Sequence, residues 1–309
     1  MNITLSQLLN AFWLRPETAL WRYLDISVMQ GLEISGKSLD FGCGDGIFSF
    51  IRAGGELASD FDAFRSVGDL EKFNQKVDVY NHAHELGYIK VVEDAEYKIS
   101  VGFDHKNALL QKAEKLNFYE SLVLGDGNSE LPFEDGEFDS IFSNIVYWLD
   151  DMDRVLSELK RILKPGGLLI LLLPDVKLLG SSFYYNYQVS SKVDGYGFLE
   201  LLDRGRVSGN FKQAKASEEW LRLFASNGLL IKEHKTHLSM LTLKVWDIGL
   251  RPLFPALAKV TSKLVEADRM EFKLDLMQIC EQYIQPLIDL ELSSAGSKKG
   301  FHCFSLTKA

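Results

Sequence analysis

The stretch Ser38-Leu39-Asp40-Phe41-Gly42-Cys43-Gly44-Asp45-Gly46-Ile47-Phe48-Ser49-Phe50 places three glycines at alternate positions between two apolar segments. The first four residues are typical of a short buried strand, and the residues from Ile47 onward are typical of a beginning helix. Glycine lacks a Cβ, so a glycine turn accepts positive φ angles and lets backbone N–H groups approach a ligand at a helix N-terminus. Glycine turns also join strands to helices for packing alone, so the turn by itself leaves both interpretations open.

Two features of this stretch sharpen the ligand-binding interpretation. Asp40 lies inside the expected strand, where a buried carboxylate without a partner would be costly, and we therefore expect a partner for it. The third glycine, Gly46, comes one residue earlier than in the G-x-G-x-x-G fingerprint of dinucleotide-binding folds. This spacing argues against a nicotinamide cofactor.

Leu39 to Gly46 resembles motif I of class I methyltransferases, which use S-adenosylmethionine. The resemblance implies that the glycine turn passes under the amino-acid end of the cofactor. It assigns cofactor contacts in this stretch to Asp40, Gly42, Cys43, Gly44 and Gly46.

Later segments match the same family in the same order. The strand expected at 97–104 ends in Asp104, whose carboxylate could accept two hydrogen bonds from a ribose diol or could simply cap the next helix. After a strand at 121–124, Asp126 would accept a hydrogen bond from adenine by resemblance, or serve as a turn residue, and Gly127 follows it. The block 131–144 resembles the L-P-F-x-D-x-x-F-D entry to the fourth strand, with Asn144 at the cofactor edge. Lys164-Pro165-Gly166-Gly167 is expected to be a turn before a strand at 168–173.

These matches predict an α/β fold, a doubly wound, seven-stranded, mostly parallel sheet of the Rossmann-like class I methyltransferase type with helical insertions. We expect an N-terminal helical cap at 1–37 and a core at 38–237 plus 300–309, with insertions at 53–96 and 175–215. A helix is expected at 216–227 with Ser217 as its N-cap. A helical insertion at 238–299, with helices near 255–266 and 271–291, would cover the substrate or form a contact between two copies of the chain.

The bulk properties limit the location and the partners. The net charge of −9 disfavours a nucleic-acid substrate, since phosphate binding relies on clustered Lys and Arg. Three widely spaced cysteines, unsuited to a metal site, and an N-terminus without a signal-peptide pattern indicate a reducing, cytoplasmic setting. The longest aliphatic run, 168–173, is too short to span a bilayer, which leaves peripheral membrane contact open.

The predicted function is methyl transfer from S-adenosylmethionine, with S-adenosylhomocysteine as product, to an O, N or C nucleophile of a small or a sugar- or lipid-linked molecule. The alternatives are a catalytically silent binding or scaffold protein with this fold and, less favoured, a nicotinamide-dependent oxidoreductase. A base is needed only for a poor nucleophile. The N-terminal helices could bring Arg15, Trp21 and Arg22 to the site. The candidates for catalysis and substrate positioning, each of which could instead be structural, are His82, His84, His105, Tyr147, Tyr185 and His234.

Overall fold

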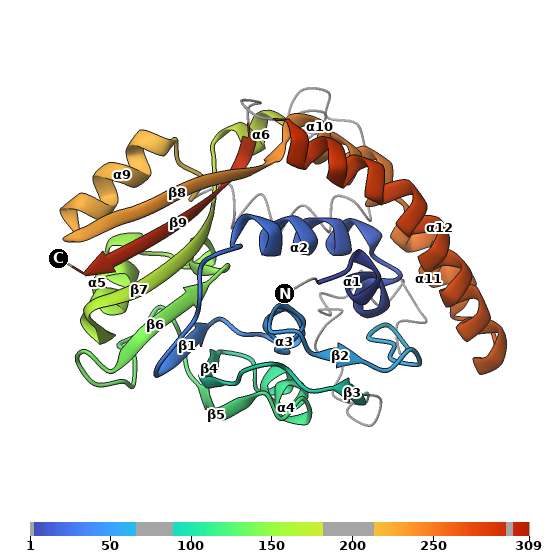
Figure 1. The fold of residues 1–309 in the computed structure, drawn as a ribbon, viewed down its shortest axis with the longest axis horizontal. Coiled ribbons are helices and arrows are strands. Elements are labelled where there is room, and N and C mark those ends of the chain that lie inside the picture. The colour runs from blue at the N-terminus through green and yellow to red at the C-terminus, as the bar shows by residue number, and fades with distance from the viewer. Residues whose placement is uncertain (1–2, 66–88, 182–212, 295–298, 309) are drawn as a thin grey trace.

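The computed structural model of this chain describes residues 3–65, 89–181, 213–294 and 299–308. It contains a seven-stranded sheet in the order β5-β4-β1-β6-β7-β9-β8 (Figure 1). The strands are β1 (Ser38–Phe41), β4 (Ile99–Asp104), β5 (Tyr119–Leu124), β6 (Phe138–Ser143), β7 (Leu163–Pro174), β8 (Leu229–Ser239) and β9 (Lys299–Lys308).

The sheet is parallel except at one strand. β1 pairs in parallel with both β4 and β6, whereas β9 runs antiparallel to its neighbours β7 and β8. The central strands β1, β4 and β6 are buried along almost their whole length. The predicted seven-stranded, mostly parallel sheet is confirmed, and it has a single antiparallel strand.

Helices pack on both faces of this sheet (Figure 1). One face carries α5 (Met152–Ile162), whose apolar residues recur at helical spacing, and α9 (Ser217–Ser226), which packs on β8. α3 (Ile47–Arg52) follows the glycine turn, and α4 (Asn107–Lys115) packs against β4 and β5. Two short helical segments follow strands β6 and β7, the 3-10 helix Val146–Trp148 and α6 (Lys177–Ser181).

The N-terminal cap and the helical insertion lie against each other (Figure 1). The cap consists of α1 (Leu5–Phe12), which Thr4 caps, and α2 (Pro16–Val28), which begins at the proline as expected. The insertion contains α10 (Met240–Lys244), the π-helix Val245–Leu250, α11 (Leu253–Thr261) and α12 (Glu266–Ser293). Within the predicted insertion 53–96, β2 (Glu56–Leu57) and β3 (Val91–Glu93) form a small antiparallel pair.

Two local expectations were wrong. The first residue before α9 is Ala216, and Ser217 is already helical; the Glu219 carboxylate accepts the Ala216 N–H at 2.9 Å instead. The Lys164 to Gly167 segment is no separate turn but part of β7, where the register against β6 shifts and Gly166 takes a φ of +75°. The apolar pattern predicted both elements but not their first residues.

Candidate cofactor and acceptor site

The glycine turn lies at the carboxyl end of β1, where its three glycines have φ angles of +81°, +60° and +76°. A Cβ on Gly42 would collide with Ile145, and one on Gly46 would lie 2.8 Å from the Tyr119 ring. A Cβ on Gly44 would meet nothing within 4 Å. Two of the glycines therefore allow close packing, and Gly44 borders open space.

Backbone hydrogen bonds tie this turn to the end of the neighbouring strand β4. The N–H groups of Gly42 and Cys43 both donate to the Phe103 carbonyl, at 2.8 and 3.0 Å. The Gly44 N–H donates to Asp104 Oδ2 at 3.0 Å. The turn and Asp104 therefore form one unit at the carboxyl edge of the sheet.

Asp104 is largely buried, with 7% of its surface exposed. Its Oδ1 accepts the Lys106 N–H at 2.9 Å, so the carboxylate supports both the glycine turn and the segment before α4. A carboxylate offers about four acceptor positions, and these two bonds leave room for two hydroxyl groups. Helix α4 begins after Lys106 without a side-chain cap, so Asp104 does not cap it, and the ribose role stays a prediction.

Asp40 has the partner that its buried position requires. Its Oδ2 accepts a hydrogen bond from the Tyr119 hydroxyl at 2.7 Å, and both groups are buried. Burial raises the pKa of the Asp40 carboxyl, and burial together with Asp40 raises that of the Tyr119 phenol far above its usual value. This pair joins β1 to β5, and no local pattern pointed to it because 79 residues separate the partners.

Replacing Tyr119 with phenylalanine should lower the free energy of unfolding by about 1 to 2 kcal/mol, since the buried Asp40 oxygen then loses a donor. Urea unfolding would measure the change. Tyr283→Phe is the matched control, because the Tyr283 side chain is exposed on α12 and should lose almost nothing. Equal stability of the two variants would contradict a role for the Asp40–Tyr119 bond.

The remaining predicted cofactor residues lie at the ends of β5 and β6. Asp126 is exposed, and its Oδ1 accepts the Asn128 N–H at 2.9 Å in a turn. Gly127 lies against Phe41, and Asn144 is half-buried directly after β6. Because β5, β4, β1 and β6 are adjacent and parallel, their carboxyl ends form one edge. Leu124, 56% exposed at the end of β5, adds an apolar surface that sequence reasoning missed.

Cys43 lies in the turn itself, half-buried. Burial raises the pKa of its thiol far above the usual value, which disfavours the nucleophilic thiolate form.

The candidates for catalysis are spread over the molecule. His82, His84 and Tyr185 lie outside the described residues. His105 is mostly exposed, with its Nδ1 3.4 Å from Asp104 Oδ1. His234 lies on the edge strand β8, where its Nε2 is 2.9 Å from His302 Nδ1, and four strand spacings separate β8 from β1. The structure therefore does not bring His234 to the glycine turn.

Tyr147 does lie beside the cofactor edge, three residues after Asn144. Its ring centroid is 5.7 Å from that of Phe301, which also contacts Trp21 of α2 at 5.1 Å. Trp21 in turn lies 5.0 Å from Trp246 in the π-helix. We call Trp21, Tyr147, Trp246 and Phe301 the Phe301 cluster. Sequence reasoning missed Trp246 and Phe301 as members, because they come from distant parts of the chain.

The two cap arginines take different positions. The Arg22 guanidinium carbon is 4.9 Å from the centroid of the Phe48 ring in α3, close to the glycine turn. Its charge also opposes the rise that burial causes in the pKa of Asp45. Arg15 instead is buried, with its Nε 2.8 Å from Glu17 Oε1. Of the two, Arg22 is the one beside the turn.

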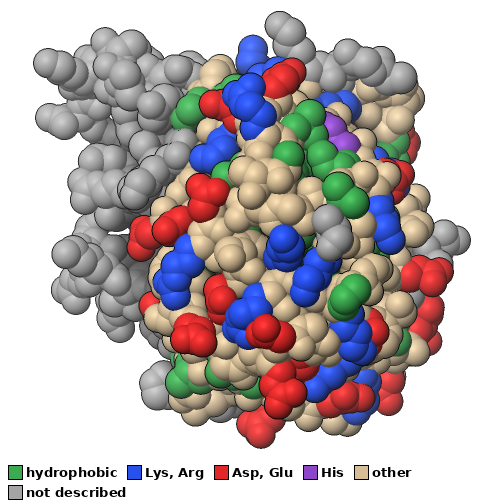
Figure 2. Space-filling view, turned by 90° about the vertical axis from the view of Figure 1, so that its left-hand side faces the viewer, with side chains coloured by type: hydrophobic (Ala, Val, Ile, Leu, Met, Phe, Trp, Pro, Cys, Tyr) green, Lys and Arg blue, Asp and Glu red, His purple; other side chains and the backbone are tan. Residues whose placement is uncertain are grey.

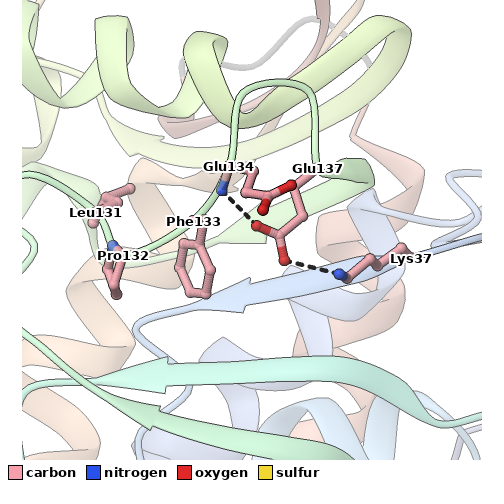
Figure 3. A pocket seen from close by; sticks show the side chains of 6 residues that line it. All are labelled: Lys37, Leu131, Pro132, Phe133, Glu134 and Glu137. Carbon is pink, nitrogen blue, oxygen red and sulfur yellow. Dashed lines mark hydrogen bonds and ion pairs between the residues drawn. The ribbon is translucent and has the colours of Figure 1, made fainter.

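An open groove of about 530 Å³ lies at the opposite edge of the sheet (Figure 3). Lys37 and Glu137, which precede β1 and β6, form an ion pair of 2.8 Å beside it. The Phe133 ring packs on Phe138. The 131–139 block thus supports packing and a surface groove, away from the glycine turn.

The face of the molecule that carries α5 and α9 shows no large patch of one charge sign among its described residues. On the side that carries α5 and α9, the described basic and acidic side chains are interspersed (Figure 2). Among the described residues, no helix is both long enough and apolar enough to cross a bilayer.

Part of the chain is similar to known proteins. Residues 87–171 match the family model described as a methyltransferase domain. The chain is 38% identical over 103 residues to malonyl-[acyl-carrier protein] O-methyltransferase 1 of Coxiella burnetii, a match that covers 31% of this chain and 34% of that protein. The corresponding protein of Xylella fastidiosa is 34% identical over 74 residues, or 23% and 25% of the two chains. The chain thus spans about a third or less of the length of these curated relatives.

Among solved structures, a methyltransferase of Thermotoga maritima described as a possible histamine N-methyltransferase aligns with a TM-score of 0.47. The two chains are 16% identical, and the alignment covers 99% of this chain and 100% of the other.

Proposed function

We propose that this protein is an S-adenosylmethionine-dependent methyltransferase of class I that acts on a small molecule, because residues 87–171 match a family model described as a methyltransferase domain. The acceptor would present an O, N or C nucleophile, on a small or a sugar- or lipid-linked compound. The observation that carries the proposal is the bond between the Gly44 N–H and the Asp104 carboxylate, which joins the glycine turn to the expected ribose ligand.

The residues at the carboxyl edge fit this cofactor. The open space beside Gly44 suits the methionine portion, and the Asp104 carboxylate has acceptor positions left for the ribose hydroxyls. Exposed Leu124 offers an apolar surface for a purine, with Asp126 next to it to accept from an amino group. Asn144 would border the reacting end of the cofactor.

When bound, the cofactor supplies an activated methyl group on a sulfonium. The chain then has to orient the acceptor and exclude water, and positioning of this kind accounts for a large part of such a rate enhancement. The Phe301 cluster, beside the end of β6, would form the apolar wall of the acceptor site.

We do not assign to this chain the methyl acceptor for which its relatives are named. Two of them are named for acting on malonyl-[acyl-carrier protein], but the match covers about a third of each chain or less. The proposal of a cytoplasmic location is supported by Cys43, Cys280 and Cys303, which are all free thiols.

Calorimetric titration with S-adenosylhomocysteine and, separately, with NAD tests the proposal. We expect S-adenosylhomocysteine to bind with a dissociation constant in the micromolar range, a free energy of binding of about −8 kcal/mol, and we expect no binding of NAD. Binding of NAD alone would favour the oxidoreductase alternative. Binding of neither would favour the scaffold alternative.

A further inference from the structure

A buried histidine and carboxylate pair joins the cap to the end of β8. His237 Nε2 lies 2.7 Å from Asp25 Oδ1, and the two residues are 4% and 1% exposed. Asp25 Oδ2 also accepts a hydrogen bond from Arg22 Nη1 at 3.0 Å. The sequence analysis did not consider this histidine, because 212 residues separate it from Asp25.

The second ring nitrogen of His237 has no hydrogen-bond partner among the residues that the structure describes. Nδ1 is buried, and it makes no hydrogen bond. Since the Asp25 carboxylate accepts at Nε2, that nitrogen carries the proton and Nδ1 presents a lone pair. Buried polar atoms almost always have partners, so this buried nitrogen without one calls for an explanation.

The position of His237 relates it to the acceptor site. Its ring centroid is 5.8 Å from that of Phe301, the centre of the Phe301 cluster. Asp25 lies about one helical turn along α2 from Arg22, which packs on Phe48 directly after the glycine turn. Leu238, the next residue, has a φ of +62°, unusual for leucine and found where surrounding structure imposes the conformation.

A second pair of this kind serves as a comparison. His302 Nε2 lies 2.9 Å from Asp175 Oδ2, but its Nδ1 already contacts His234 Nε2 at 2.9 Å. Each nitrogen of His302 thus has a polar neighbour at 2.9 Å, although Nε2 makes no hydrogen bond there. Among the described residues, His237 Nδ1 has neither a hydrogen-bond partner nor an ion-pair partner, and in this it differs from both nitrogens of His302.

We propose that His237 is the general base for the methyl acceptor and that Asp25 is its positioning residue, an inference that rests on the proposed function. The acceptor is then a neutral hydroxyl compound with an aromatic or similarly flat apolar body, which packs against the Phe301 cluster. A carboxylate acceptor is already ionised and needs no base, so it is not the expected class.

The proton and electron balance of this step is complete. The acceptor O–H proton moves to His237 Nδ1, and the oxygen electron pair forms the new O–C bond to the methyl group. The C–S bond breaks, and its electron pair remains on sulfur, which becomes a neutral thioether. The resulting imidazolium is stabilised by the Asp25 carboxylate.

The first experiment is ¹⁵N NMR of histidine-labelled full chain with S-adenosylhomocysteine bound, titrated with phenol and with benzoate, which share a ring but differ in the acidic group. We expect His237 to have a protonated Nε2 and an unprotonated Nδ1 at pH 7.5, and we expect phenol alone to shift the Nδ1 resonance. A protonated Nδ1, or an Nδ1 resonance that phenol leaves unmoved, overturns the proposal.

The second experiment compares wild type with His237→Gln, whose amide nitrogen can still donate to Asp25. With labelled S-adenosylmethionine and the same two probes, we expect methylation of phenol to fall roughly 100- to 10,000-fold in the variant. Cofactor affinity and thermal stability should stay as in wild type, and residual activity should rise with pH as phenolate forms.

The outcomes separate the two proposals. Failure of wild type to bind S-adenosylhomocysteine contradicts the proposed function. If the cofactor binds normally but benzoate is the only methylated probe, the role of His237 is contradicted and the proposed function is not. The same holds if the cofactor binds normally and His237→Gln methylates phenol as fast as wild type.

Discussion

Replacing Asp62 with alanine should lower the free energy of unfolding by about 3 to 5 kcal/mol, because it leaves a buried arginine without its counter-charge. Asp62 Oδ2 accepts from Arg269 Nε at 2.7 Å, and the two residues are 5% and 7% exposed. Asp62 Oδ1 accepts from Trp13 Nε1 and from the Phe64 N–H, both at 2.9 Å. One carboxylate thus joins α1, the loop after β2 and α12.

Urea unfolding followed by tryptophan fluorescence measures this loss. The matched control is Asp60→Ala, two residues earlier in the same loop. Asp60 forms an ion pair with Lys90 in which both side chains are largely exposed, so its loss should cost less than about 1 kcal/mol. If Asp62→Ala were as stable as Asp60→Ala, the buried pair would not hold the insertion to the cap.

The second large effect concerns cofactor affinity. Asp104→Ala should weaken binding of S-adenosylhomocysteine roughly 30- to 150-fold, or about 2 to 3 kcal/mol, because the ribose hydroxyls lose a charged acceptor and the Gly44 N–H loses its partner. Asp104→Asn should lose less cofactor affinity than Asp104→Ala, since the amide oxygen of asparagine can still accept a hydrogen bond.

Calorimetry on the folded variants measures the effect. Asp135→Ala is a suitable control, because Asp135 is exposed and pairs with Arg161 near the start of β6, away from the glycine turn. Unchanged affinity in a folded Asp104→Ala protein would reject the ribose assignment.

The sequence predicted those parts of the site that depend on neighbouring residues. The glycine turn and Asp104 each follow a short apolar strand, and parallel strands place their carboxyl ends together. Period and turn chemistry are local signals, so they predicted the strands and the glycine turn themselves, whereas the family resemblance implied the mostly parallel, seven-stranded sheet.

The missed contacts all join distant segments. Asp25 and His237, and likewise Asn10 and Lys273, are more than 200 residues apart, and nothing in either local pattern indicates the partner. The buried Lys273 ammonium donates to Asn10 Oδ1 and to the carbonyls of Ser59 and Phe61. In the sequence this lysine is one of many charged residues of both signs on its helix. The contact that it makes between the insertion and the cap was therefore not predictable.

The position of β9 affects the order in which the chain can fold during synthesis. β9 lies between β7 and β8, and it is the only strand of this sheet that pairs with β8. On the ribosome, β8 is therefore made before its partner β9. The whole helical insertion, which lies between them in the sequence, must emerge before β9 can pair with β8. Unpaired strand edges attract other chains, so this interval is when the nascent protein is most exposed to aggregation. If the α10 to α12 segment folds onto the cap during this interval, it would hold β9 near β7 and β8. Fewer chain conformations would then have to be sampled before β9 pairs with them.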